Sequence, residues 1–120
     1  MFKSLVRSSA LIATTAILSS LPALAQVSAA NVRALNVARN WAVNNNGGLS
    51  VYRPAACMFN TGDGGGSCLV KKDNSGFRFK FLGGGPGWVE LGKTPTTETE
   101  LEVSADGRQV TQVIYNGSPR

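Results

Sequence analysis

Three glutamates at alternating positions are the densest set of chemically active side chains in this 120-residue sequence. Glu98, Glu100 and Glu102 would share one face of a strand, with neighbouring carboxylates about 7 Å apart at the usual strand rise. They could supply a catalytic carboxylate pair or hold a cation. Alternatively, they could balance cations on neighbouring strands, and we favour this structural role. The cations expected on the same face are Lys71, Arg78 and Lys80.

The chain contains no histidine. It therefore lacks the common general base at neutral pH, a histidine-activated nucleophile and an imidazole metal ligand. A glycosidase-type carboxylate pair remains possible, but a sugar cleft needs several aromatic side chains. The candidates outside the expected core are Trp88, Tyr52 and Tyr115. We expect no enzymatic activity, no catalytic or metal site and no cofactor.

Cys57 and Cys68 are the only cysteines, and we expect them to form one disulfide. Closing a loop of 12 residues would stabilise a small domain by roughly 3 kcal/mol. The alternative is a redox or metal pair. The ten-residue spacing is not Cys-x-x-Cys, which argues against that alternative.

A glycine-rich segment, Asn60–Ser67, joins the two cysteines. A phosphate-binding loop would continue into a lysine and a helix, whereas Cys68 is expected to open a strand. A calcium loop would need more carboxylates than Asp63. The composition instead predicts a flexible hairpin tip closed by the disulfide. If any loop residues bind a ligand, the candidates are Asp63, Trp88 and Tyr52.

The first 25 residues have the pattern of a secretory signal peptide. A basic start is followed by a charge-free stretch from Ser8 to Ser20, and an Ala-x-Ala ending predicts cleavage after Ala25. A membrane anchor is the alternative, but the sequence after Leu24 is too polar for a span. We therefore expect a secreted or periplasmic protein of residues 26–120, with no membrane span after cleavage.

The charge after cleavage bears on the partners. Ten basic and seven acidic residues leave +3, with no basic run longer than Lys71-Lys72. A net charge this small, without a longer basic cluster, does not predict nucleic acid binding. The expected partner is an unidentified envelope or extracellular protein or polymer, and the oligomeric state is left open.

One amphipathic helix is expected over about residues 29–46. Apolar residues recur at spacings of three and four, Ser28 or Asn31 could cap its start, and asparagines followed by Gly47 could end it. Extended segments are expected at Leu49–Arg53 and Ala55–Phe59, broken by Pro54.

The central strand is expected at Phe77–Phe81, where three phenylalanines alternate with two cations. A tight turn at Asn74-Ser75 would set Val70 opposite Phe79 on the buried face. Five glycines and two prolines make residues 82–95 a long excursion, with a short strand expected at Trp88–Leu91. A final hairpin turns at Ala105–Gly107, placing Val110 and Ile114 beside Leu101 and Val103. Residues 116–120 are expected to be loose.

These patterns together predict an α+β fold: one N-terminal amphipathic helix packed on a four- to five-stranded antiparallel meander sheet over about residues 49–115, with one disulfide. The residues expected in the core are Val32, Leu35, Ala38, Trp41, Val51, Val70, Phe77, Phe79, Phe81, Leu101, Val103, Val110 and Ile114.

Three stretches, Ala10–Leu18, Asn31–Asn40 and Phe79–Gly87 with the following Thr94–Thr96, resemble small secreted proteins of unknown function from cyanobacteria. The resemblance implies export and a compact domain, and it transfers no functional residue. The expected helix and meander are also similar in topology to cystatin-like and PepSY-like domains. The cystatin motif residues are not evident, so this similarity implies no protease inhibition.

The function expected from these observations is that of an exported small binding module for a protein, a peptide or an envelope polymer. The alternatives are an accessory envelope protein with a purely physical role and a carboxylate-dependent hydrolase. An exposed Trp88 with ordered neighbours would favour the binding module. A hydrolase would need glutamates with raised pKa values in a cleft.

Overall fold

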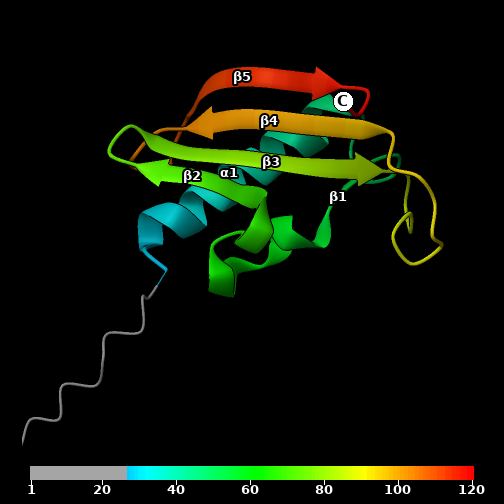
Figure 1. The fold of residues 1–120 in the computed structure, drawn as a ribbon, viewed down its shortest axis with the longest axis horizontal. Helices are drawn as coiled ribbons and strands as arrows, with labels where there is room; N and C mark the ends of the chain where they lie inside the picture. The colour runs from blue at the N-terminus through cyan, green and yellow to red at the C-terminus, as the bar shows by residue number, and fades with distance from the viewer. Residues whose placement is uncertain (1–26) are drawn as a thin grey trace, which may run out of the picture.

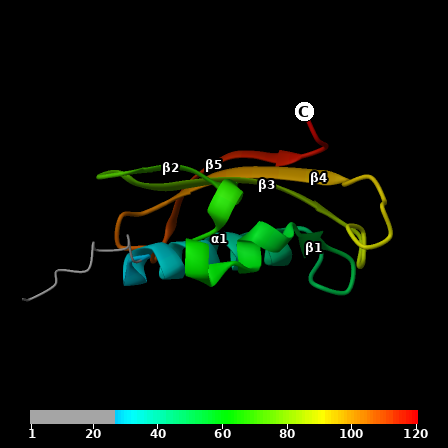
Figure 2. The same cartoon turned by 60° about the horizontal axis from the view of Figure 1, so that its bottom comes forward.

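The computed structural model describes residues 27–120, so the expected signal peptide and its cleavage site lie outside the described residues. A helix and a sheet form two layers, as Figure 1 and Figure 2 show from two sides. The helix is α1 (Ala29–Asn45), and the strands are β1 (Arg53–Pro54), β2 (Leu69–Asp73), β3 (Gly76–Gly84), β4 (Thr97–Val103) and β5 (Val110–Gly117). Three short 3-10 helices, Ala56–Phe59, Thr61–Asp63 and Gly66–Cys68, lie between β1 and β2.

The helix α1 begins and ends close to the expected positions. Its start is capped by Ser28, whose side-chain oxygen accepts a hydrogen bond from the Asn31 backbone at 3.1 Å. Its last residue is Asn45 and its C-cap is Asn46, and Gly47 follows with a φ of 101°, which glycine adopts without strain. Its buried face consists mainly of small side chains, which allow a close approach to the sheet. They are Ala34, Ala38 and Ala42.

The sheet is built around β3 and confirms the expected α+β fold class. All strand pairs are antiparallel, and the order is β1-β3-β4-β5, with β2 also paired to β3. The tight turn at Asn74-Ser75 forms as expected, since Asp73 pairs with Gly76. A side chain at Gly76 would overlap the backbone carbonyl of Val103, so this turn requires glycine. Both β1 and β2 lie along the same edge of β3, near its opposite ends.

The core lies between α1 and one face of the sheet. Phe77, Phe79 and Phe81 are buried there beside Leu101 and Val103, as expected. Trp41 and Val110 are partly buried and pack against its margin. Val32 is only partly buried and is not among the residues packed against this core.

The prediction for the segment after α1 is wrong. Val51 was expected in a strand and in the core, but it lies in a turn, with its backbone N–H bonded to the Gly48 carbonyl at 3.1 Å, and is 58% exposed. Only Arg53 and Pro54 pair as a strand. The expected extended segment Ala55–Phe59 is largely a 3-10 helix. Alternation in a short apolar run did not distinguish a strand from consecutive turns.

Val70 and Ile114 were also expected in the core, and both are exposed, at 50% and 37%. Each is an extra residue at an irregularity in its ladder. The pairing with β3 passes from Lys71 to Leu69, so Leu69 rather than Val70 lies opposite Phe79. The pairing of β5 with β4 likewise passes over Ile114. One inserted residue shifts every side chain beyond it to the other face of the strand, which parity alone could not foresee.

The final hairpin is fastened to the start of α1. Both Arg33 side-chain nitrogens Nε and Nη2 donate to the Asp106 carbonyl, at 3.1 and 3.0 Å. Gly107 lies against the first turns of the helix, where a side chain would overlap the Ala30 carbonyl. At the other end of α1, Asn46 and Asn116 exchange hydrogen bonds at 3.2 and 3.1 Å. The helix is therefore held to β5 and its turn at both ends.

Candidate functional site

Trp88 is fixed at one end of the sheet by backbone contacts. The β3–β4 connection folds into consecutive turns rather than the expected strand at Trp88–Leu91, and the Lys93 N–H donates to the Trp88 carbonyl at 2.8 Å. The indole Nε1 donates to the Arg53 carbonyl in β1 at 2.9 Å. The ring lies over Gly84, where a Cβ would come within 2.8 Å of Trp88 Cγ. The tryptophan is therefore partly buried, with its orientation set by neighbouring backbone.

Two hollows meet at Trp88. The first, of about 400 Å³, lies between β1, the Ala56–Phe59 helix and the β3–β4 connection, and the second, of about 510 Å³, lies beside the disulfide and the outer face of β3. Besides Trp88, the first is lined by Arg53, Pro54, Phe59, Pro86, Val89 and Glu90 among others. The second is lined by Val70, Leu82, Pro95, Lys80, Glu98 and Arg120 among others.

Exposed apolar side chains gather in these hollows. Phe59 and Val89 are at least half exposed in the first, and Val70 and Leu82 are exposed in the second. Arg39 lies over the Phe59 ring, 5.0 Å from its centre. Contiguous exposed apolar surface with polar groups around it is typical of an interaction site. We therefore treat the surface formed by the two hollows as the candidate site and call it the Trp88 surface.

The glutamate ladder lies on the outer face of β4 and is neutralised by arginines. Arg78 Nε donates to Glu102 at 2.9 Å across the β3–β4 pair, as the expected charge compensation requires. Glu98 and Glu100 instead bind Arg120, which bridges them through Nε and Nη2. The Arg120 guanidinium also lies 4.0 Å from the centre of the Tyr115 ring. Arg120, in the tail expected to be loose, is therefore held on this face by both glutamates and by the tyrosine ring, and its backbone N–H also donates to Glu98.

The surroundings of Glu98 oppose a role for this residue in acid catalysis. The hydrogen bond from Arg120 lowers the pKa of Glu98 below its ordinary value, although burial acts in the other direction. The same carboxylates raise the pKa of Arg120. Lys71 pairs with Asp73 at 3.3 Å rather than with the ladder. A general acid would need a raised carboxyl pKa, the reverse of what Glu98 shows.

Tyr52 does not belong to an exposed binding loop. It is buried on the helix side of the sheet, against Gly83, where a side chain would overlap its ring. Burial raises its pKa to about 12, opposed by the neighbouring Thr99 hydroxyl. Thr99 itself donates to Asn116 at 2.7 Å, and within the described residues the Tyr52 hydroxyl has no hydrogen bond of good geometry. The Tyr52 ring therefore packs on Gly83 on one face of β3, and the Trp88 ring packs on Gly84 on the other face.

The centre of the glycine-rich segment packs against α1. Asn31, buried in α1, donates to the Gly64 carbonyl at 3.0 Å, and a Cβ at Gly65 would lie 3.1 Å from both Leu35 and Phe79. Gly64 and Gly65 approach α1 so closely that side chains there would crowd Asn31, Leu35 and Phe79, so these two positions favour glycine. The expectation of a hairpin tip is wrong, because the segment forms short 3-10 helices instead of joining two paired strands. Its composition could not reveal the helix beneath it.

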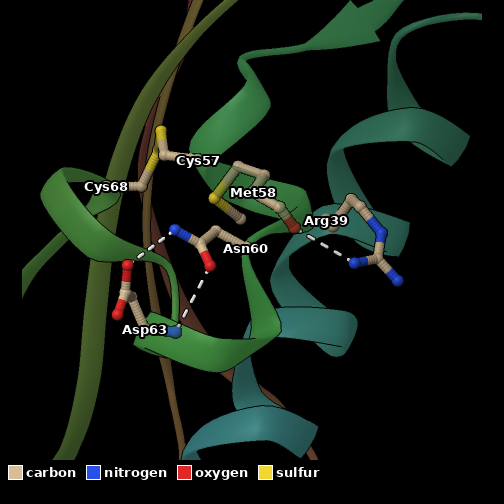
Figure 3. The surroundings of a disulfide bond; sticks show 6 residues. All are labelled: Arg39, Cys57, Met58, Asn60, Asp63 and Cys68. Atoms are coloured by element: carbon tan, nitrogen blue, oxygen red, sulfur yellow. Dashed lines mark hydrogen bonds between the residues drawn. A yellow bond between two sulfur atoms is a disulfide. The ribbon is translucent and has the colours of Figure 1, made fainter.

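Cys57 and Cys68 form the expected disulfide, with Cα atoms 5.8 Å apart. Figure 3 shows its surroundings, including Asp63, which is exposed and accepts a hydrogen bond from the Asn60 side chain at 2.8 Å. Asp63 is not among the residues lining either hollow, nor is Tyr52. Of the three candidate loop residues, only Trp88 lies on the Trp88 surface.

Sequence reasoning missed Phe59, Val70 and Arg120 as residues of this surface. Val70 was assigned to the core by alternation, and Phe59 to an extended segment. Arg120 was assigned to a loose tail, although Glu98, which has no cation directly opposite it on β3 or β5, could have indicated it. Lys80 faces Glu100, but Leu82 faces Glu98.

Comparison of the chain with known protein families, curated proteins and solved structures found no match. Among residues 27–120, no helix is long and apolar enough to cross a membrane. The same part of the chain contains no group of three or more acidic, cysteine or histidine residues placed to hold a metal ion.

Proposed function

We propose that this protein is an exported binding module that holds an extended peptide or polymer segment across the Trp88 surface. The observation that carries the proposal is the meeting of two hollows, of about 400 and 510 Å³, at one anchored indole. Volumes of this size are typical of ligand pockets. Two shallow hollows on either side of one ring suit successive side chains of an extended segment better than one compact molecule.

The charges near the second hollow indicate what such a segment should carry. Its lining combines apolar side chains with Lys80 and with Arg120, whose guanidinium is already engaged by two glutamates. Within this lining Lys80 is exposed, and no ion pair of good geometry engages it among residues 27–120. A ligand segment with an aromatic or aliphatic residue followed by an acidic group would match this arrangement.

A binding role is also supported over a catalytic one. The lowered pKa of Glu98 keeps this carboxyl ionised at neutral pH, and each of the three glutamates in the ladder is engaged by an arginine. A purely physical envelope role would not require an indole held between two apolar hollows.

The test is selection from a library of random peptides displayed on phage, with the disulfide-bonded protein immobilised. Selected peptides are then titrated against the wild type, against Trp88→Ala and against Leu49→Ser. Leu49 is an exposed apolar residue outside both hollows and serves as the matched control. We expect peptides that bind the wild type and the control equally and lose at least about tenfold in affinity with Trp88→Ala, since buried tryptophans dominate binding energy.

Two results would contradict the proposal. One is a selection that yields no peptide binding the wild type more tightly than the Trp88→Ala variant. The other is a set of peptides whose affinity falls as much with Leu49→Ser as with Trp88→Ala. Either result would favour an accessory protein with a physical role.

A further inference from the structure

Asparagine followed by glycine occurs twice in this sequence, at Asn46-Gly47 and at Asn116-Gly117. A glycine has no side chain, so its backbone nitrogen reaches the side-chain carbonyl carbon of the preceding asparagine more easily than the nitrogen of any other residue. These two steps are therefore the positions where this chain most readily loses a side-chain amide. The asparagines are 70 residues apart, one just after α1 and the other near the end of β5.

The fold brings the two asparagine side chains into one reciprocal pair. Asn46 Nδ2 donates to Asn116 Oδ1 at 3.2 Å, and Asn116 Nδ2 donates to Asn46 Oδ1 at 3.1 Å. Asn46 Nδ2 also donates to the Ala42 carbonyl at 2.8 Å. Asn116 Oδ1 also accepts a hydrogen bond from the Thr99 hydroxyl at 2.7 Å. Each reactive amide is therefore held by the other, and a rotation of either one breaks the pair.

The backbone differs between the two steps. Asn116 and Gly117 lie in β5, where pairing with β4 holds the chain extended. Gly47 lies in the turn after α1, and among residues 27–120 its N–H makes no backbone hydrogen bond of good geometry. An unbonded nitrogen in a turn is freer to attack the preceding side chain than a nitrogen in a paired strand. Asn46 is therefore the more reactive of the two asparagines.

We propose that Asn46 is a deamidation site and that Asn116 restrains its reaction. The Gly47 nitrogen attacks Asn46 Cγ and forms an N–Cγ bond. The Cγ–Nδ2 bond breaks, and the side-chain nitrogen leaves as ammonia with the proton of the Gly47 N–H. The product is a cyclic succinimide, which water opens at either ring carbonyl to give aspartate or isoaspartate. Water is the only co-reactant, and no oxidant or reductant takes part.

The reaction releases one of the two attachments between α1 and the final hairpin. The new carboxylate has no hydrogen to donate, so the bonds to the Ala42 carbonyl and to Asn116 Oδ1 are lost. Its negative charge lies beside the carbonyl groups that end α1, where the helix dipole disfavours it. The bonds from Arg33 to the Asp106 carbonyl remain at the other end of α1. This inference is independent of the Trp88 surface, because neither asparagine lines either hollow.

The test is mass spectrometry of the disulfide-bonded protein during incubation at neutral pH. After reduction, trypsin places Asn46 and Asn116 in different peptides, because basic residues separate them. Fragmentation of each peptide assigns the mass gain of deamidation to one asparagine. The same measurement on the urea-unfolded chain gives the rate of each step without the fold.

Three variants separate the restraint from a general loosening of the fold. Asn116→Ala removes both bonds to Asn46. Asn45→Ala removes a bond of the same kind, from Asn45 Nδ2 to the Trp41 carbonyl at 2.8 Å, and is the matched control. Asn116→Asp keeps an acceptor for Asn46 and for Thr99 and loses only the donor, so it tests the pair even if the alanine variant unfolds. The urea midpoint of each variant shows whether it is folded.

We expect Asn46 to deamidate before Asn116 in the folded wild type, and both to react more slowly than in the unfolded chain. The rate at Asn46 should rise about tenfold with Asn116→Ala and less with Asn116→Asp, since freeing the reactive amide then breaks fewer hydrogen bonds. Asn45→Ala should leave this rate unchanged. Earlier conversion of Asn116, or a folded Asn46 as reactive as the unfolded one, would overturn the proposal. A rate at Asn46 unchanged by both Asn116 variants, or raised equally by Asn45→Ala, would overturn it as well.

Discussion

Replacing Phe79 with alanine tests the central feature of the fold. Phe79 is fully buried at the middle of β3, between Phe77 and Phe81 on the face that α1 covers. A buried aromatic ring removes about 150–250 Å² from water, which at about 25 cal/mol per Å² gives an upper limit near 4–6 kcal/mol. Measured losses for such replacements are about 3–5 kcal/mol. Because a domain of this size has about 5–15 kcal/mol in total, Phe79→Ala should leave it barely folded.

The assay is urea unfolding of the disulfide-bonded protein, followed by far-ultraviolet circular dichroism. With a denaturant slope near 1.5 kcal/mol/M, the expected loss lowers the midpoint by about 2–3 M. Leu91→Ala is the control, because Leu91 is 64% exposed and its loss should change the stability by less than about 0.5 kcal/mol. A Phe79→Ala midpoint within the range of the control would refute the assignment of β3 as the centre of the core.

Three further predictions use the same unfolding assay or the fluorescence of the protein. Replacing both Cys57 and Cys68 with alanine should lower the free energy of unfolding by roughly 3 kcal/mol at unchanged ionic strength. An unchanged free energy of unfolding would mean that the disulfide adds no stability to the glycine-rich segment. Because Arg120 lowers the folded-state pKa of Glu98, their contact stabilises the fold above the unfolded-state pKa and is lost as pH falls through the folded-state value. The urea midpoint should therefore fall less between neutral and acid pH in Glu98→Gln than in the wild type, and equal slopes would contradict this. Gly84→Ala should displace the Trp88 indole and red-shift the protein's tryptophan emission, whereas an unchanged spectrum would show that the ring does not depend on this glycine.

The fold was predictable where the sequence pattern was long and regular. The alternation of three phenylalanines with Arg78 and Lys80 located β3. The run of asparagines followed by Gly47 located the C-terminal end of α1. The errors fall where one residue interrupts a pattern. Val70 and Ile114 alternate correctly in the sequence, but an extra residue in each ladder turns them outward. Such irregularities depend on the neighbouring strand, which the local sequence does not describe.

The candidate site was predictable only in part. Trp88 could be singled out because it follows Pro86 and Gly87 in a segment poor in regular structure. Its partners come from distant parts of the chain, since Arg53 supplies the carbonyl that holds the indole and Arg120 approaches from the tail. Tyr52 shows the opposite error, because it was expected outside the core as a candidate binding residue and is buried. The Tyr52 ring occupies the space left by Gly83, which has no side chain. A glycine adds nothing to the hydrophobic periodicity of a strand, so the sequence pattern did not indicate this contact.

The small side chains along α1 constrain how this sequence can change over evolutionary time. The alanines at positions 34, 38 and 42 leave the interior volume to be filled from the sheet, chiefly by phenylalanines. Enlarging a helix residue alone would force the layers apart, and shrinking a phenylalanine alone would open a void. Substitutions on the two layers should therefore be accepted in pairs, with a gain of volume on one layer matched by a loss on the other. Lineages that descend from this chain should record that exchange as correlated changes between the helix and β3.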